Sequence, residues 1–455
     1  MRESPLVITG GLLLTMDPLH PDPDPVQGWL HVGVDGRIVA LGADPPPLVD
    51  GAEIVDVAGC LVAPGFVSAH SHLFTSGSRG LGMDQSLYGW IDAMLGATRG
   101  ATAADVYWLT RHGAQDFLAS GITTAYDFTS SGLDFHRESA GVASYSQSPP
   151  PVDFQHAQLR AKVDAGLRHM HSVMLCQALD EAAVFDHLDE VVARAAEVAD
   201  DPTHLGVSVS GTVQWASAPV AAVLELAAMR RHKLTNQSHF LETPHEVQLQ
   251  QEKFGWYRDA GALGPDLVFG HFIQTTDEII TEAAAAGCGM SWQPTSNGRL
   301  ASGVAQIPRM RELGMRVGIG LDDQSCTDIS DPFANLRFGI YLLRAVHRDP
   351  AAMPVRDMLQ LHTRGSAEVL GLAGDVGSLA VGRYADVLVV DPRDPDTGPV
   401  WDPWGTYALA CGQRNLKQVW VGGELVVSDG QRLDGAQHPV RDEVHSRLAK
   451  LAANR

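Results

Sequence analysis

Two histidines one residue apart stand at the end of an apolar segment near the start of the chain. The segment "APGFVSAHSHLF" covers residues 63–74 and contains His70 and His72. Side chains two residues apart on a β-strand point to the same face of that strand. Two imidazoles on one face can bind a single metal ion without any bend in the backbone. The pair alone is a weak signal of a metal site, because two histidines on a strand are often only polar residues at the rim of the fold.

Three further apolar segments end in side chains that bind metals or transfer protons. His239 ends "NQSHF", and Glu242 follows three residues later. His271 ends "DLVFGH", and Asp322 ends "VGIGLD", an apolar run in which an unpaired carboxylate would be costly to bury. Three imidazoles and one carboxylate suit Zn²⁺ or Fe²⁺, with one position left open for water. The sequence therefore predicts a divalent metal site, with zinc as the first choice and iron as the alternative.

These residues require a scaffold that brings the ends of several strands together. Residues 63–372 alternate short apolar segments with alanine-rich segments of helical length, and eight of them are predicted strands: "GFVSAHSH", "GITTAYDF", "HSVMLCQ", "HLGVSVSGT", "KLTNQSHF", "DLVFGHFI", "GCGMSWQPT" and "RVGIGLDD". This pattern is typical of an α/β fold, the (β/α)8 TIM barrel, whose active sites form at the carboxyl ends of the strands. A doubly wound open sheet is the alternative, but no G-x-G-x-x-G opening is present.

The two ends of the chain have a different pattern. Residues 1–62 and 373–435 contain strand and turn signals, with loops rich in proline and aspartate between them. Neither end has enough strands for a core of its own. We therefore expect both ends to close one small β-sandwich domain beside a catalytic barrel over residues 63–372. Residues 436–455 are predicted to form a C-terminal helix.

Composition excludes several classes of partner. The 455 residues carry a formal net charge of −21, which disfavours nucleic acid and anionic membranes as partners. The chain has no apolar run of membrane-spanning length and no recognisable export signal. Its five cysteines are scattered without C-x-x-C spacing, as is typical of reduced thiols. These features predict a cytoplasmic protein.

The lysines favour one metal ion over two. Two-metal sites of this type need a bridging group, commonly a carbamylated lysine at the end of the fourth barrel strand. The fourth predicted strand, in "HLGVSVSGTVQ", contains no lysine. The sequence therefore predicts a mononuclear site.

Seven stretches, in order along the chain, resemble the amidohydrolase superfamily, in the branch of cytosine, guanine and adenosylhomocysteine deaminases and triazine hydrolases. They are "PGFVSAHSHLF", "SHFLETPHEV", "VFGHFIQTTDEI", "QPTSNGRLASG", "RVGIGLDD", "TRGSAEVLGL" and "VGSLAVGRYADVLVVD". The resemblance implies the same barrel with a small β-sandwich. It also implies the metal ligands His70, His72, His239 and Asp322. Glu242 would be the proton shuttle, and His271 would polarise the water or the substrate.

The implied reaction is hydrolytic deamination of an N-heterocycle, a small-molecule substrate. A metal lowers the pKa of its bound water, and the resulting hydroxide attacks an electron-poor ring carbon. Asp322 would take the proton from the water, and Glu242 would deliver one to a ring nitrogen and the leaving group. The alternative is hydrolysis of another bond on the same scaffold, with release of halide or alkylamine, or cleavage of an amide, urea or thiocarbamate.

Residues near the strand ends are candidates for substrate contact. Asp323 and Cys326 resemble the melamine-deaminase pattern, although Asp323 could instead cap a turn and Cys326 could simply be buried. Nucleoside-type deaminases usually carry a histidine after the fourth strand, in a G-P-H setting. The corresponding stretch here, "SGTVQWAS", has Gln214 and Trp215 instead, which argues against a nucleoside or adenosylhomocysteine substrate. The remaining candidates are Arg79, Gln85, Trp90, Trp292 and Asn297. Relatives of this kind often assemble, so a homo-oligomer is also expected.

Overall fold

The computed structural model describes residues 2–17, 25–132, 135–139, 141–145, 151–175, 180–395 and 397–453. The chain forms two compact units, each built from three separate segments. The first unit contains Met1–Ser68, Gln115–Thr124 and Ser330–His438, and the second contains Ala69–Ala114, Ala125–Ile329 and Pro439–Arg455. The domain limits expected from the sequence stay a prediction.

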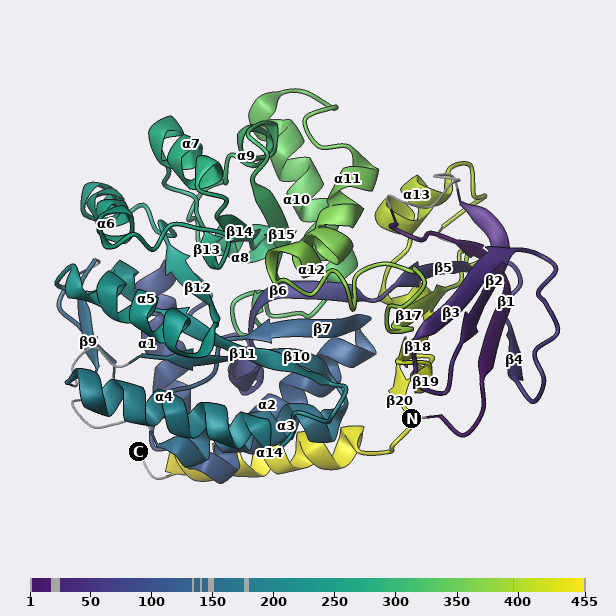
Figure 1. The fold of residues 1–455 in the computed structure, drawn as a ribbon, viewed down its shortest axis with the longest axis horizontal. Coiled ribbons are helices and arrows are strands. Elements are labelled where there is room, and N and C mark those ends of the chain that lie inside the picture. The colour runs from purple at the N-terminus through teal and green to yellow at the C-terminus, as the bar shows by residue number, and fades with distance from the viewer. Residues whose placement is uncertain are drawn as a thin grey trace. The chain divides into compact units, whose positions relative to one another are not determined.

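The first unit contains a mostly antiparallel sheet made from both ends of the chain. Its strands follow the order β20-β19-β18-β17-β5-β1-β2-β3, and β4 pairs with β1. Strand β5 pairs with β17 and so joins the N-terminal strands, purple in Figure 1, to the C-terminal ones. The strands are β1 (Leu6–Leu13), β2 (Val26–Val32), β3 (Ile38–Ala43), β4 (Glu53–Asp56), β5 (Leu61–Pro64), β17 (Val387–Val390), β18 (Leu416–Val421), β19 (Glu424–Ser428) and β20 (Gln431–Arg432).

Alternating apolar residues explain why this sheet has its own core. In β1, Leu6 and Ile8 are buried, and in β17, Val387 and Val389 belong to the same apolar cluster. Side chains two apart share a face of a strand, so one face of the sheet is apolar. The first unit also contains the helices α10 (Pro332–His347), α11 (Val355–Gln360), η3 (Leu361–Gly365), α12 (Ser366–Val369), α13 (Pro403–Gly405), η4 (Thr406–Ala410) and η5 (Gln413–Asn415).

The parallel sheet closes into a barrel, as predicted. Its order is β15-β14-β13-β12-β11-β10-β7-β6-β16. Strands β15 and β16 are two pieces of one segment, of which β15 pairs with β14 and β16 pairs with β6. The last segment therefore connects both edges. The strands are β6 (Phe66–His72), β7 (Ile122–Asp127), β10 (Arg168–Met174), β11 (His204–Gly211), β12 (Thr235–Phe240), β13 (Leu267–His271), β14 (Gly289–Trp292), β15 (Arg316–Ile319) and β16 (Asp322–Asp323).

Each of the eight segments predicted as strands overlaps a strand of this barrel, although "HSVMLCQ" starts within β10 and its last two residues, 176–177, lie outside the described residues. Every residue of β7, β13 and β14 is buried, as expected for parallel strands covered on both faces. The elements between and after the strands are η1 (Leu73–Gly77), α1 (Leu87–Thr98), α2 (Ala103–Ala119), β8 (Phe135–Arg137), β9 (Ala143–Tyr145), α3 (Val152–Ala165), α4 (Glu181–Ala196), η2 (Val213–Trp215), α5 (Val220–His232), α6 (Val247–Ala260), α7 (Asp277–Ala285), α8 (Pro294–Arg299), α9 (Ile307–Glu312) and α14 (Gln437–Ala453).

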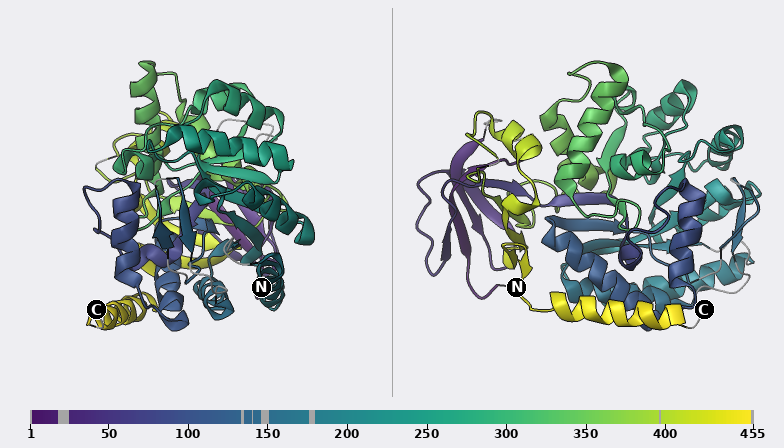
Figure 2. Two further views of the ribbon diagram at one scale, coloured as in Figure 1. Left: turned by 90° about the vertical axis from the view of Figure 1, so that its left-hand side faces the viewer. Right: turned by 180° about the vertical axis from the view of Figure 1, so that it is seen from behind.

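The C-terminal helix α14 belongs to the second unit and packs beside α2. Arg447 on α14 forms an ion pair of 2.8 Å with Asp105 in the first turn of α2. Figure 2 shows α14 in yellow alongside the blue helices. Among the described helices, none combines the length and apolar character needed to cross a membrane. A cytoplasmic location and an assembly of several copies stay predictions.

Candidate active site

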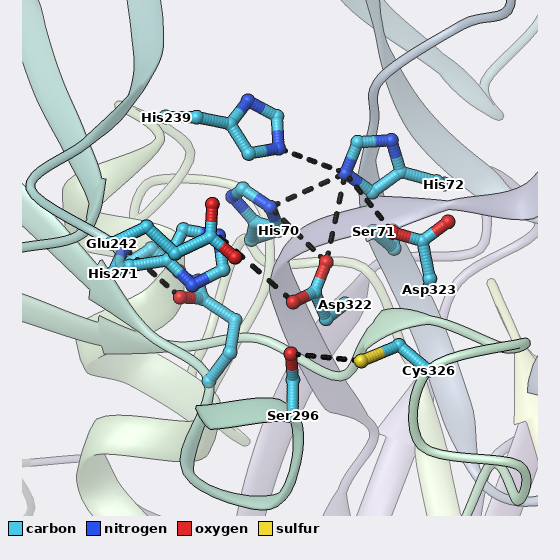
Figure 3. Close-up of polar contacts among 12 residues, drawn as sticks. His70, Ser71, His72, His239, Glu242, His271, Ser296, Asp322, Asp323 and Cys326 are labelled. Carbon is cyan, nitrogen blue, oxygen red and sulfur yellow. Dashed lines mark hydrogen bonds and ion pairs between the residues drawn. The ribbon is translucent and has the colours of Figure 1, made fainter. Parts of the chain in front are cut away.

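Side chains from four barrel strands meet at the carboxyl ends of those strands. His70 and His72 come from β6, His239 from β12, His271 from β13 and Asp322 from β16. Figure 3 shows their rings and carboxylates pointing toward one another. These side chains, together with that of Asp323, form three overlapping groups whose ligand atoms lie within 4.8 Å of one another. The groups are His70 with His72 and His239, His70 with His271 and Asp322, and His72 with Asp322 and Asp323.

Two glycines make room for His70. A Cβ atom at Gly270 would lie 2.9 Å from Cε1 of His70, and one at Gly320 would lie 2.6 Å from its Cβ. Real Cβ atoms do not approach other atoms so closely, and the backbone of β6 cannot move aside inside a packed barrel. Gly270 therefore leaves space for the His70 ring, and Gly320 lets the segment after β15 pass close to the backbone of His70.

The spacing of the polar atoms fits a metal ion. Nε2 of His72 lies 3.0 Å from Nε2 of His239 and 3.4 Å from Nε2 of His70. Oδ1 of Asp322 lies 3.4 Å from Nε2 of His70 and 3.6 Å from Nε2 of His72. Neighbouring ligands on a four-coordinate zinc ion, with bonds of about 2.0–2.1 Å, are about 3.3 Å apart. The donor set and its spacing therefore suit a divalent ion.

A glutamine that the sequence reasoning missed orients His70. Nδ1 of His70 lies 2.6 Å from Oε1 of Gln237, whose amide nitrogen donates to the carbonyl of Ala69. The glutamine oxygen can only accept, so Nδ1 of His70 carries the proton and Nε2 keeps its lone pair. Gln237 is buried and stands two residues before His239 on the same strand. A polar residue on the same strand face as a candidate ligand was the signal in the sequence that could have found it.

Burial keeps two of the histidines uncharged. Burial, followed by the neighbouring His70, lowers the pKa of His72 to about 3. The same causes hold the pKa of His239 well below its ordinary value. Burial by itself raises the pKa of Asp322. The hydrogen bond to His70 and the surrounding histidines lower the pKa by more than burial raises it, so the net shift is strongly downward. Neutral imidazoles and an ionised carboxylate are the protonation states that bind metals.

Glu242 and His271 face each other beside these residues. Oε1 of Glu242 lies 3.6 Å from Nε2 of His271, which is 3.9 Å from Oδ2 of Asp322. Burial and then the charge of Asp322 raise the pKa of Glu242 well above its ordinary value. Leu241 (φ 54°) has left-handed backbone just after β12, and this turn directs Glu242 back to the side of His239. Because its pKa is raised, Glu242 can hold a proton at neutral pH.

An amide from α8 fixes the tautomer of His271. Nδ2 of Asn297 lies 2.9 Å from Nδ1 of His271. An amide nitrogen only donates, so Nδ1 accepts and the ring proton is on Nε2. Burial lowers the pKa of His271 to about 3, which leaves the ring neutral. The backbone N–H of His271 also donates to Oε1 of Gln293. His271 thus presents an N–H donor toward Glu242 and Asp322.

Asp323 and Cys326 lie in different surroundings. Oδ2 of Asp323 is 3.7 Å from Nε2 of His72, and this residue lines the cavity described below. Burial and the adjacent Asp322 raise the pKa of Asp323 well above its ordinary value. Cys326 is fully buried, and its sulfur lies 3.1 Å from the hydroxyl of Ser296. Cys326 also belongs to an apolar cluster that contains Trp90.

The site opens into a cavity with an empty volume of about 950 Å³. Its ionisable lining residues are the clustered side chains described above: His72, His239, Glu242, His271, Asp322 and Asp323. Five small neutral side chains also line it: Thr129, Ser130, Ser131, Ser210 and Thr212. The rest of the lining is apolar: Phe74, Leu87, Trp90, Ile91, Met94, Leu95, Phe128, Met174, Trp215 and Leu300. Among the described residues, no lysine or arginine lines the cavity.

The expected substrate contacts divide into two groups. Trp90 and Asp323 line the cavity. Asn297 is not among the lining residues, but it hydrogen-bonds to His271, which is. The described part of the chain places the others outside the lining: Arg79, Gln85, Gln214, Trp292 and Cys326. Gln85 is exposed, whereas Gln214 and Trp292 are fully buried. Trp215, next to Gln214, lines the cavity instead.

Known proteins place this site in a family. Residues 61–426 match the sequence model of the amidohydrolase family. The chain belongs to the amidohydrolase family. This family is metal-dependent. The predicted family and the predicted enzyme class, a metal-dependent hydrolase acting on C–N bonds, are thereby confirmed, and the relatives below support hydrolytic deamination as its reaction. The identity of the metal and the roles of the individual residues stay predictions.

The curated relatives of this amidohydrolase are deaminases by name. A 5-methylthioadenosine/S-adenosylhomocysteine deaminase from Halobacterium salinarum is 30% identical, with 98% of each chain covered. One from Syntrophobacter fumaroxidans is 27% identical over 94% of each chain. A 5'-deoxyadenosine deaminase from Methanosarcina mazei is 26% identical over 98% of each chain.

Solved structures share the fold of this amidohydrolase. An adenosine deaminase from Xanthomonas campestris with bound zinc has a TM-score of 0.84 at 19% identity, with 98% of each chain covered. A zinc complex of atrazine chlorohydrolase from Arthrobacter aurescens has a TM-score of 0.80 at 20% identity, covering 97% of this chain and all of the other. At such low identity, these likenesses support the predicted barrel with its additional sheet and say nothing about substrate.

Replacing Gln237 by methionine is expected to weaken zinc binding by about 10–100-fold, the usual cost of removing the partner that orients a ligating histidine. Methionine keeps the volume of the side chain but cannot accept the proton of His70 Nδ1. Zinc affinity is measured by competition with a chromophoric chelator. Gln250→Met is the matched control, because Gln250 is equally buried but its amide nitrogen donates to the carbonyls of Thr243 and His245 and, among the described residues, to no candidate metal ligand. Equal affinities for the two variants would refute this role.

Proposed function

We propose that this amidohydrolase removes the amino group from an N-heterocycle that carries uncharged, largely apolar substituents. The observation that carries the proposal is the division of the cavity. Its ionisable side chains cluster around the candidate metal site, and the remaining lining is apolar or neutral. A flat ring would lie against this cluster, which we call the ring end of the cavity, and its substituents would extend along aromatic and aliphatic side chains.

The ring end supplies the groups that hydrolysis of a C–N bond requires. His70, His72, His239 and Asp322 would hold one divalent ion, for which zinc is the expected choice. When bound, such an ion supplies the Lewis acidity that activates water for attack. The spacing of 3.0–3.6 Å between these side chains supports this assignment.

The remaining side chains would move protons and stabilise charge. Asp322, held ionised, accepts the proton of the attacking water. Glu242, whose pKa is raised by burial, carries a proton to a ring nitrogen and then to the departing amine. Nε2–H of His271 donates to the attacking oxygen, because its tautomer is fixed by Asn297. One water molecule is consumed in this reaction: its oxygen becomes the ring carbonyl oxygen, and the ring amino group leaves as ammonia.

Charge on a substituent separates the candidate substrates. The residues around Gln214 argued against a nucleoside, but the relatives are named for two adenosine derivatives, 5-methylthioadenosine and S-adenosylhomocysteine. These two are therefore the first substrates to compare. The first carries a neutral thioether, whereas the second ends in an amino acid with an ammonium and a carboxylate. Burying a carboxylate with no cationic partner is costly. The lining has no lysine or arginine in the described chain, so it favours the neutral substituent.

The test measures ammonia release by the zinc-loaded protein from both adenosine derivatives and from amino-triazines with alkyl groups. We expect kcat/KM for 5′-methylthioadenosine to exceed that for S-adenosylhomocysteine by at least about 10²-fold, because an unpaired buried charge costs several kcal/mol. A chelator-stripped sample is the control. Equal values would refute the neutral-substituent proposal. Release of halide or alkylamine from triazines, without ammonia from any substrate, would instead favour hydrolysis of another bond.

A further inference from the structure

We propose that Glu225 and Lys253 are positioning residues that hold one wall of the cavity, residues 212–216, and thereby decide which substituents fit beside the ring. Neither residue lines the cavity in the described chain, and neither belongs to the site described above. The inference deepens the proposed function and rests on it only for the choice of ligands. It concerns the connection between β11 and α5.

The wall segment brings two side chains to the cavity. Thr212 follows β11 directly, and Trp215 ends the short helix η2. Both line the cavity. The indole ring of Trp215 lies 5.6 Å, centroid to centroid, from the ring of His239. The position of this segment therefore sets the free space directly beside the proposed metal site.

The start of the wall segment is held by a buried carboxylate. Glu225 projects from α5 and is fully buried. Its Oε1 accepts hydrogen bonds from the backbone N–H groups of Thr212 at 2.6 Å and Val213 at 3.1 Å. Its Oε2 accepts from Nδ2 of Asn236 at 2.8 Å and from the hydroxyl of Tyr257 at 2.8 Å. All four bonds come from neutral donors, and two of them come from the wall segment.

The end of the wall segment is held by a buried ammonium. Lys253 projects from α6 and is also fully buried. Its Nζ donates to the carbonyls of Gln214 and Ala216, each at 2.7 Å, and to the carbonyl of Gly141. An ammonium group has three donors, and here three carbonyls accept them. The third bond also connects the wall segment to the hairpin of β8 and β9.

Opposite charges at the two ends of the segment restrict its position. The carboxylate binds N–H groups at residues 212 and 213, and the ammonium binds carbonyls at residues 214 and 216. A shift of the segment would leave buried charged groups without partners, which is costly. Apolar residues at 225 and 253 would fill the same space but would not fix the backbone. The two charges therefore fit a positioning role better than a packing role.

The main test is Lys253→Met, studied in the full-length, zinc-loaded chain. We expect faster hydrogen–deuterium exchange of the amides at 212–216. Loosening the wall should also lower the ratio of affinities for 5′-methylthioadenosine and S-adenosylhomocysteine about tenfold, because both hydrogen bonds from the charged ammonium to the wall segment are lost. Affinities are measured by calorimetry in the Glu242→Gln background, in which turnover is expected to be slow. Zinc affinity should stay unchanged.

Two further variants separate positioning from general destabilisation. Lys162→Met removes another fully buried lysine, one that pairs with Asp127 at 2.6 Å and does not contact the wall segment. It should leave the affinity ratio unchanged. Glu225→Gln should lower the ratio, because one uncharged amide oxygen replaces the two carboxylate oxygens that accept from the wall segment, Asn236 and Tyr257. Adding Asn236→Asp returns the negative charge and accepts from the new amide nitrogen, which leaves the amide oxygen for the wall segment, so it should restore the ratio.

The outcomes distinguish this inference from the proposed function. Unchanged exchange at 212–216 in both Lys253→Met and Glu225→Gln would overturn the inference. Faster exchange with an unaltered affinity ratio would overturn it as well, as would an equal fall in the ratio for Lys162→Met. If Lys253→Met fails to fold, Glu225→Gln and its rescue decide the matter. Exchange and binding do not depend on turnover, so an absence of ammonia release would contradict the proposed function alone.

Discussion

Glu242→Gln is expected to lower kcat for ammonia release by at least about 10²-fold while the zinc content stays unchanged. General acid–base catalysis by a positioned side chain typically contributes 10²–10⁴-fold. Glutamine has the same size and keeps the contact with the cavity, but it cannot release or take up a proton at neutral pH. Burial raises the pKa of Glu242, and its Oε1 lies 3.6 Å from Nε2 of His271.

The measurement is steady-state ammonia release at saturating substrate, together with zinc content by atomic absorption. Glu246→Gln is the matched control, because Glu246 is four residues away and exposed, and its carboxylate contacts Ser139. The control should keep nearly full activity. Wild-type turnover in Glu242→Gln would refute the shuttle role. Loss of zinc from this variant would instead show that Glu242 contributes to metal binding.

His239→Ala is expected to weaken zinc binding by at least about 10³-fold, which is more than the 10–100-fold cost of losing an outer partner. Activity at limiting zinc should fall in parallel. His239 lies 3.0 Å from His72 through the Nε2 atoms, and burial keeps the pKa of its ring low enough for a free lone pair. Alanine removes this donor, and the remaining three side chains would have to hold the ion alone.

Chelator competition gives the zinc affinity of this variant, and thermal unfolding with and without zinc reports how far the metal stabilises the fold. His245→Ala serves as the control, because His245 is exposed and lies outside the cavity lining among the described residues. We expect zinc to raise the melting temperature of the control but hardly that of His239→Ala. Equal zinc affinities for the two variants would exclude His239 as a ligand.

The expected barrel followed from local patterns. Apolar segments of strand length alternate with helical ones along the sequence. Strands β7, β13 and β14 are buried throughout, which matches the expectation for parallel strands covered on both faces. The sequence also suggested the convergence of His70, His72 and Asp322, because parallel strands of a barrel end on the same side. In contrast, the limits of the domains are still predictions.

The substrate contacts were harder to predict, because many cavity-lining residues lie beyond the strand ends, on helices such as α1 and on the connections that lead to them. Periodicity gives no direction for side chains in such connections. Gln214, one of the expected contacts, is buried outside the lining, whereas its neighbour Trp215 lines the cavity. The hairpin of β8 and β9 was likewise not expected, since it arises within a segment rich in serine and proline.

By itself, the sequence determined the barrel, the family and the residue types at the strand ends, because strand alternation and strand-end chemistry are local properties. Only the tertiary structure decided which groups support them. Gln237 orients His70 across 167 residues of sequence, and Gly270 gives the same ring its space. Lys253 binds carbonyls 37 and 39 residues before it. Such partners are set by how the strands and helices pack around one another, and no spacing in the chain encodes that packing.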